Sequence, residues 1–122
     1  MNYSIIIPFF NEENNVKKLN EEINSTIKKH DNKTILNCSS NEYFNVINQK
    51  NLNGNILNTV FKEYRDGELK FISFNAKKAR GLLTKFVINN KITSNNDLKD
   101  FNLENYKFDM SLSDESTFVF TR

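Results

Sequence analysis

The Asp66-Gly67 dipeptide constrains the fold more than any other pair of residues in this chain. It separates two strand-like segments, Ile56–Tyr64 and Leu69–Phe74. A two-residue hairpin turn needs positive backbone φ values, which Asp and Gly adopt more readily than most residues. The sequence therefore predicts an antiparallel hairpin whose return strand runs to Phe74.

The outgoing strand of this hairpin shows moderate alternation between two faces. Leu57, Thr59, Phe61 and Glu63 share one face, and Ile56, Asn58, Val60 and Lys62 share the other. Alternation with a period of two is typical of a strand within a sheet.

The rest of the chain predicts further strands, two main helices and short helical segments. Strands are expected at Tyr3–Ile7, Lys33–Cys38 and Thr117–Thr121, helices at roughly 13–29 and 76–90, and short helices after Ser39–Asn41 and after Ser94 or Asn95. Leu98, Phe101, Tyr106 and Phe108 are expected to pack in the core. We expect one domain over 1–122, with a mixed α/β (α+β) fold: about five strands, one antiparallel hairpin and two main helices.

The predicted helix at 76–90 carries most of the chemistry. At about 100° per residue, its apolar arc consists of Ala79, Leu82, Leu83, Phe86 and Val87. Lys77, Lys78 and Lys85 lie opposite with Gly81 among them, and Arg80 lies at the border. Arg80 can hold a phosphate or a carboxylate by two parallel hydrogen bonds.

Two interpretations of this helix remain open. A glycine in a helix interior costs about 0.5–1 kcal/mol relative to alanine, and Gly81 leaves room for a ligand to approach closely. Alternatively, the lysines form an ordinary solvated face and Gly81 admits a neighbouring strand.

Composition restricts the kind of partner and the compartment. The chain has 122 residues and a net charge of +2, so any anion binding must be local. Cys38 is the single cysteine, which excludes an internal disulfide and fits a reducing compartment. The N-terminal apolar run is too short to span a membrane. We therefore expect a cytoplasmic protein with no membrane partner.

Two single residues, His30 and Cys38, are of types that occur in metal sites and redox sites. His30 is the only histidine, so a two-histidine metal site cannot form. Cys38 ends a predicted strand, where a buried apolar role is more common than a peroxide-sensing thiol. We expect neither a metal nor a cofactor.

Several segments in order along the chain resemble one family. Ile72–Leu82, with the sequence Ile-Ser-Phe-Asn-Ala-Lys-Lys-Ala-Arg-Gly-Leu, resembles a motif of the peroxide stress protein YaaA family. Ile35–Phe44, the hairpin at Val60–Gly67 and the segments Phe101–Phe108 and Phe118–Arg122 resemble other parts of that family. The resemblance extends over about 19–122, and it implies a family with a long N-terminal part that is missing here.

The resemblance implies a function in the response to hydrogen peroxide. Family members are described as cytoplasmic, as limiting free iron, and as binding DNA through a positively charged cleft. By resemblance, Lys77, Lys78 and Arg80 would line that cleft, with Asn41, Glu42 and Tyr43 near it. Gly81 and Lys85 complete the set of candidate DNA-binding or anion-binding residues.

The first twenty residues resemble a different family. Ser4–Val16, with its Pro-X-X-Asn-Glu loop after an apolar strand, is similar to the start of a family 2 glycosyltransferase. The Asp-X-Asp motif that would hold the metal and diphosphate in that family is absent from the sequence.

The sequence supports three hypotheses. The first is a protein that binds DNA phosphates through the cationic helix, and we expect binding rather than catalysis. The second is an enzyme that holds a small anionic substrate in the same place, with Glu42 or Tyr43 carrying a proton. The third is a fragment that is nonfunctional or depends on a partner; a glycosyltransferase fragment is a more distant alternative.

Overall fold

The computed structural model describes residues 3–6, 21, 34–40, 44 and 54–122. Its strands are β1 (Tyr3–Ile6), β2 (Thr34–Asn37), β3 (Asn55–Arg65), β4 (Glu68–Lys70), β5 (Lys107–Phe108) and β6 (Thr117–Thr121). They form one sheet in the order β1-β2-β3-β6-β5, and β4 pairs with β3. The first four strands of that order are parallel, whereas β5 and β4 each run antiparallel to their neighbour. The prediction of a mixed sheet with one antiparallel hairpin is confirmed.

The hairpin turn has the predicted chemistry. Asp66 and Gly67 adopt φ values of 54° and 79°, the conformation that a two-residue turn requires. The predicted length of the return strand, Leu69–Phe74, is wrong. β4 ends at Lys70, and the Ile72 carbonyl already accepts a helical hydrogen bond of 2.9 Å from the Ala76 N–H. The helix-forming residues that follow outweigh the strand preference of these aromatic residues.

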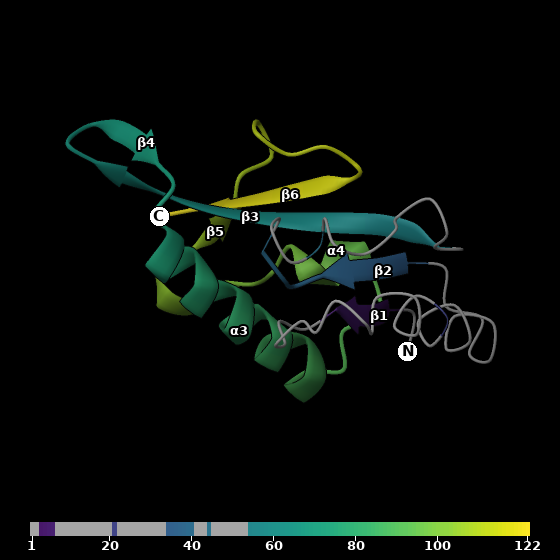
Figure 1. Ribbon diagram of the computed structural model, residues 1–122. Helices are drawn as coiled ribbons and strands as arrows, with labels where there is room; N and C mark the ends of the chain where they lie inside the picture. The colour runs from purple at the N-terminus through teal and green to yellow at the C-terminus, as the bar shows by residue number, and fades with distance from the viewer. Residues whose placement is uncertain (1–2, 7–20, 22–33, 41–43, 45–53) are drawn as a thin grey trace.

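Helix α3 (Ser73–Asn89) covers one face of the sheet (Figure 1). The helix predicted at 76–90 is thus confirmed and begins three residues earlier. Its buried residues are Ala76, Ala79, Leu83 and Val87. The helix ends where the Asn90 side chain donates to the Phe86 carbonyl at 2.9 Å and Lys91 turns to a φ of 50°. This packing leaves the residues between the buried and exposed arcs, Arg80 among them, at the edge of the helix–sheet interface.

Two short helical segments follow α3, namely α4 (Asn95–Leu98) and the 3-10 turn η3 (Leu103–Asn105). The predicted cap is present, since the Ser94 hydroxyl accepts from the Asp97 N–H at 3.1 Å. Of the helix predicted at 13–29 only Glu21 is described, and of the one after Ser39–Asn41 only Phe44; both are helical. The remaining residues of those two predictions lie outside the described residues.

An aromatic layer joins the helices to the sheet. The Phe61 ring lies 5.2 Å from both the Tyr106 and the Phe120 ring centroids, and 5.9 Å from that of Phe101. Each such aromatic pair contributes about 0.5–1.5 kcal/mol beyond area burial. The predicted core roles of Leu98, Phe101, Tyr106 and Phe108 are therefore confirmed. This layer fixes α3 against the middle of β3, and so it positions the side chains at the helix edge.

No helix in the described part of the chain is long and apolar enough to cross a membrane.

Candidate functional site

The candidate site is a pocket of about 340 Å³ beside the middle of β3. β2 pairs with β3 as far as Asn58, and β4 pairs with it from Glu63 onward. Thr59–Lys62 therefore lie between these two partners, while β6 pairs with the same stretch along its other edge. The pocket is lined by Ser39, Ser40, Thr59, Val60, Phe61, Lys62, Phe71, Ser73 and Arg80. It thus lies at the carboxyl end of a parallel strand, where open α/β sheets commonly bind ligands.

Arg80 is the most unusual group in this pocket. Its Nε atom is buried and has no hydrogen-bond partner among the described residues. Burial lowers the pKa of the Arg80 guanidinium, although an arginine remains charged at neutral pH. Leaving a buried donor unpaired costs about 1–3 kcal/mol. The Arg80 side chain as a whole is only half-buried and lines the pocket, so its accessible atoms are candidates for binding a ligand from solution.

The described lining of the pocket is positively charged. Lys62 and Arg80 are the cations among its described lining residues, and none of these residues is acidic. Ser73 opens α3, whose start has no side-chain cap and no acidic residue in its first turn. The unpaired N–H groups at a helix N-terminus attract anions. Cations, hydroxyls and a helix N-terminus together favour an anionic ligand.

Asn37 fixes the loop that leads into this pocket. Its side-chain oxygen accepts hydrogen bonds from the Ser39 N–H at 2.9 Å and from the Ser39 hydroxyl at 2.6 Å. Its side-chain nitrogen donates to the Asn58 side chain at 3.0 Å. The Thr59 hydroxyl also donates to the Asn37 carbonyl at 3.2 Å. One buried amide therefore holds the end of β2 against β3.

Cys38 lies next to Arg80 and is buried, as the sequence predicts. Burial raises the pKa of the Cys38 thiol to about 11, although a hydrogen bond with Thr84 and the Arg80 charge both oppose this rise. The thiolate is the reactive form of cysteine. Arg80 therefore faces a neutral thiol here and is not neutralised by it.

Glu63 of β3 is a buried carboxylate that lies beside the other flank of α3, away from the Arg80 pocket. Its oxygens accept hydrogen bonds from Asn75 at 2.7 Å and from the Arg65 Nε at 2.9 Å, and Arg122 lies at 3.5 Å. The Asn75 hydrogen bond is the main cause that lowers the pKa of Glu63; burial opposes it, and the two arginines add to it. This cluster ties the hairpin, the start of α3 and the end of β6 together.

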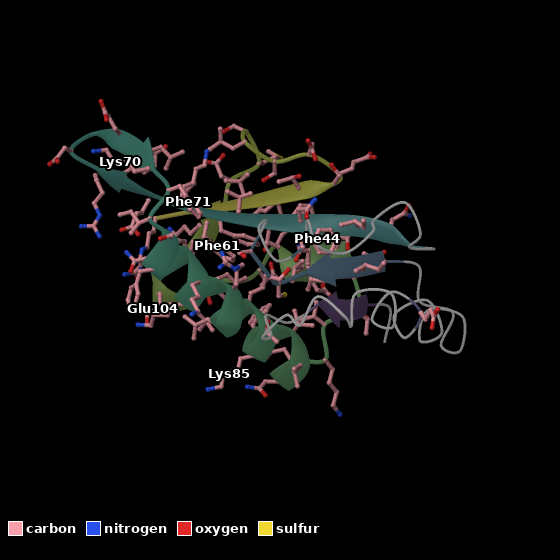
Figure 2. The ribbon with its side chains drawn as sticks, viewed as in Figure 1. Phe44, Phe61, Lys70, Phe71, Lys85 and Glu104 are labelled. Carbon is pink, nitrogen blue, oxygen red and sulfur yellow. The ribbon has the colours of Figure 1, made fainter. Side chains whose placement is uncertain are left out.

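The cations on this flank are already paired. Arg122 donates to the Glu104 carbonyl at 3.0 Å and lies 4.5 Å from the centre of the Tyr106 ring. Lys78 lies 3.4 Å from a Glu104 carboxylate oxygen, and Figure 2 shows Glu104 beside the first half of α3. A second hollow of about 100 Å³ lies here, lined by Phe74, Lys78, Glu104 and Arg122 among others. Each of the two cations that line this hollow has a carboxylate partner, Glu104 for Lys78 and Glu63 for Arg122.

The predicted cationic residues are thus divided between the two flanks of α3. Around the helix, Lys77 lies about 60° from Arg80, whereas Lys85 and Lys78 lie about 140–160° away. Lys77 and Lys85 are exposed and form no ion pair with any described residue. Lys85 extends away from the sheet (Figure 2). The structure therefore places Arg80 in the pocket, Lys77 on the adjacent part of the helix surface, and Lys78 in the paired cluster with Lys85 on the same side of the helix.

Gly81 and the segment 41–43 are the remaining predicted site residues. Gly81 is exposed, and a Cβ added there would meet no atom within 4 Å. The suggestion that Gly81 admits a neighbouring strand is therefore wrong, because the position faces open space. Asn41, Glu42 and Tyr43 lie outside the described residues, although they directly follow Ser39 and Ser40 of the pocket.

Sequence reasoning missed several contributors to these sites. Glu63 was placed on the same strand face as Phe61, and an acidic residue on a core face is itself a signal of a buried ion pair. Lys62 and Phe71 were not identified as pocket residues because their positions depend on where β2 and β4 end. Among the described residues, no group of three or more His, Cys, Asp or Glu side chains could hold a metal ion.

The fold and pocket define a class of protein: a mixed α/β domain with a cationic pocket at the carboxyl end of a parallel strand. Comparison with known sequences is more specific. The family described as "Peroxide stress protein YaaA" matches residues 8–112. This match covers most of the chain, so the chain belongs to the peroxide stress protein YaaA family.

Curated relatives agree with this assignment. A UPF0246 protein of Saccharophagus degradans is 47% identical over 105 residues, which are 86% of this chain and 41% of that protein. A UPF0246 protein of Colwellia psychrerythraea is 39% identical over 104 residues, covering 85% of this chain and 40% of that protein. One from Clostridium beijerinckii is 47% identical over 107 residues, with shares of 86% and 41%. The chain thus spans about two-fifths of the length of these relatives.

The extent of the match also bears on the first twenty residues. The family match begins at residue 8, earlier than the predicted start near residue 19, and so it includes much of the segment that resembles a glycosyltransferase. The glycosyltransferase resemblance stays a prediction.

Proposed function

We propose that this chain acts in the cytoplasmic response to hydrogen peroxide by binding the phosphate groups of DNA, which limits the oxidative damage linked to free iron. The family supports the peroxide role. One structural observation carries the binding role: the half-buried Arg80 lines a pocket whose described lining contains no acidic residue, and no described carboxylate forms an ion pair with it. A phosphate in the pocket would accept charge-assisted hydrogen bonds from the accessible part of the Arg80 guanidinium.

Lys77 extends this interaction to a second phosphate. It is exposed, forms no ion pair with any described residue and lies about 60° from Arg80 around the helix, so it can contact a phosphate flanking the one at Arg80. Contacts of this kind position a protein on DNA without reading its sequence. They also release counterions, so the affinity should fall steeply as salt increases.

Gel-shift titrations of the whole chain against duplex and four-way junction DNA at two salt concentrations test the proposal. We expect binding at low salt that weakens at high salt and shows little sequence preference. Arg80→Gln should weaken binding at least tenfold, the loss expected for a charge-assisted contact worth about 1.5–3 kcal/mol. Absence of binding to both DNA forms at low salt would overturn the proposal.

The lysines provide a graded version of the same test. Lys77→Gln should reduce the slope of log affinity against log salt by about 0.9, the contribution of one phosphate contact, whereas Lys85→Gln, on the far side of the helix from Arg80, should leave the slope unchanged. Lys78→Gln is the matched control, because Lys78 belongs to the same helix but is paired with Glu104. An equal loss of slope for Lys78→Gln alone would contradict the division between the two flanks.

The concave shape of the Arg80 pocket favours one second candidate, an enzyme that acts on a small anionic substrate. Its volume of about 340 Å³ lies at the lower end of the range for small-molecule pockets, about 300–1,000 Å³. Glu42 or Tyr43 would then carry a proton. Conversion of a small phosphorylated or carboxylated compound, abolished by Arg80→Gln, would favour this candidate over DNA binding.

A further inference from the structure

Phe71 is a large apolar side chain that the fold leaves in solvent. It follows β4 and precedes α3 (Figure 2), and 57% of its surface is exposed. A single exposed apolar residue is common, but Phe71 lines the same pocket as Arg80 and Lys62. The pocket therefore combines an accessible aromatic surface with two cations.

This combination matches the chemistry of one nucleotide. Proteins that bind single strands place aromatic side chains under the bases and cations along the phosphates. Val60, Phe61 and Phe71 supply the apolar part of the pocket, and Arg80, Lys62 and Ser73 supply the polar part. The pocket volume of about 340 Å³ suits a ligand that has both an apolar part and a charged part. A base that is stacked within a duplex cannot enter such a pocket unless it leaves the helix.

We infer that the Arg80 pocket takes one nucleotide with an unpaired base, which stacks on Phe71 while its phosphate meets Arg80. The inference rests on the proposed DNA binding and adds to it a preference for strands with unpaired bases. Charge complementarity supports this ligand over an apolar peptide, because the charged residues of the described lining, Lys62 and Arg80, are both cations.

Phe74 provides a matched control. It is also a phenylalanine at the start of α3 and is 76% exposed, but it lines the smaller hollow beside Lys78 and Glu104. Substitutions at Phe71 and Phe74 therefore change the same side chain in the same segment and differ in the pocket that they affect. Both positions are exposed, so neither substitution removes a core contact.

Fluorescence anisotropy of the whole chain with a labelled single strand and with a blunt duplex of the same sequence tests the inference. The single strand should bind about tenfold more tightly, since stacking one base contributes about 1–3 kcal/mol. Phe71→Ala should remove this preference, Phe71→Trp should retain it, and Phe74→Ala should leave it unchanged. Equal binding of both DNA forms by the wild type, or equal effects of Phe71→Ala and Phe74→Ala, would overturn the inference while DNA binding itself stands.

The absence of tryptophan from the chain gives a second readout. In Phe71→Trp the new indole is the only one, so a base stacked on it should quench its fluorescence. Phe74→Trp should show no quenching under the same conditions. No quenching of Phe71→Trp by a saturating single strand would contradict the stacking geometry.

Adenosine 5′-monophosphate distinguishes a DNA strand from a free nucleotide as the source of the ligand. Quenching of Phe71→Trp by this compound, lost when Arg80→Gln is added, supports the nucleotide pocket. If the compound quenches and no DNA binds, the pocket inference holds and the proposed DNA binding fails. If Phe71→Ala instead abolishes self-association in sedimentation and leaves DNA affinity unchanged, Phe71 belongs to a protein interface and the inference is wrong.

Discussion

The two flanks of helix α3 carry similar cations in opposite situations. On one flank, Arg122 and Lys78 contact Glu63 and Glu104, and their charges are balanced within the fold. On the other, Arg80 shares a pocket with hydroxyl side chains, and no described carboxylate forms an ion pair with it. Both flanks are equally basic in the sequence, so net charge does not distinguish them.

This difference separates cations whose charge is balanced within the fold from cations that can bind a ligand. A buried carboxylate such as Glu63 makes its arginines part of the fold, because removing either partner leaves an uncompensated charge. An arginine without a carboxylate partner makes no comparable contribution to the stability of the fold and remains available to bind an anion.

Glu63→Gln should cause the largest loss of stability. The substitution leaves Arg65 and Arg122 facing a neutral amide inside the fold. Breaking a buried ion pair costs about 3–5 kcal/mol, and we expect about 2–3 kcal/mol because both arginines are partly exposed. Chemical denaturation followed by circular dichroism measures this loss. Glu68→Gln is the control, since Glu68 is exposed and lies 3.9 Å from Lys70; an equal loss in both variants would refute the distinction.

Acid should weaken the same cluster. Because the folded-state pKa of Glu63 lies below its ordinary value of 4.5, its stabilising contribution is present above that pH. The contribution is lost as the pH falls through the folded-state pKa. The difference in free energy of unfolding between the wild type and Glu63→Gln should therefore shrink in acidic buffers below pH 4.5. A difference that stays constant across that range would mean that Glu63 acts through packing alone.

Arg122→Met and Arg80→Met should change stability in opposite directions. Arg122→Met removes the contacts with Glu63, Glu104 and Tyr106, and we expect a loss of about 1–2 kcal/mol. Arg80→Met keeps an apolar stem and removes an unpaired buried donor, so we expect a change between zero and a gain of about 1 kcal/mol. Chemical denaturation of both variants under the same conditions measures the two changes in the free energy of unfolding. A similar loss for both would show that Arg80 is also structural.

Gly81→Ala should give the smallest effect, a gain of about 0.5–1 kcal/mol. The position lies in the middle of α3, and an added Cβ would meet nothing within 4 Å. Gly67→Ala is the matched control and should destabilise the chain, because φ is 79° there. Thermal melting of the two variants measures both changes in stability. If Gly81→Ala also lowered DNA affinity tenfold, the backbone at Gly81 would belong to the binding surface after all.

Local sequence chemistry predicted much of this fold. The Asp66-Gly67 turn and the spacing of Ala79, Leu83 and Val87 depend on neighbouring residues only, and both predictions are confirmed. The return strand was predicted too long because Phe71–Phe74 has strand-like side chains, whereas the helix formers after it determine the local structure.

The division between the two flanks could not be predicted, because it depends on distant contacts. Arg122 is 59 residues from Glu63, and no spacing rule connects them. The pocket at Arg80 lies where neither of the described partners on that edge, β2 and β4, pairs with Thr59–Lys62. Helical periodicity placed Arg80 at the border of the apolar arc, but only the register of the strands determines what lies opposite it.

The position of β6 has a consequence for how the molecule folds. β3 and β6 are neighbours at the centre of the sheet (Figure 1), although β4, the helices and β5 all lie between them in the sequence. Pairing of such distant segments is slow. The hairpin and α3 can form early from local contacts, while one edge of β3 stays open until Thr117–Thr121 arrive. During synthesis the open edge of β3 is available to pair with a strand of another chain. The yield of folded protein should therefore depend on how quickly β3 and β6 pair.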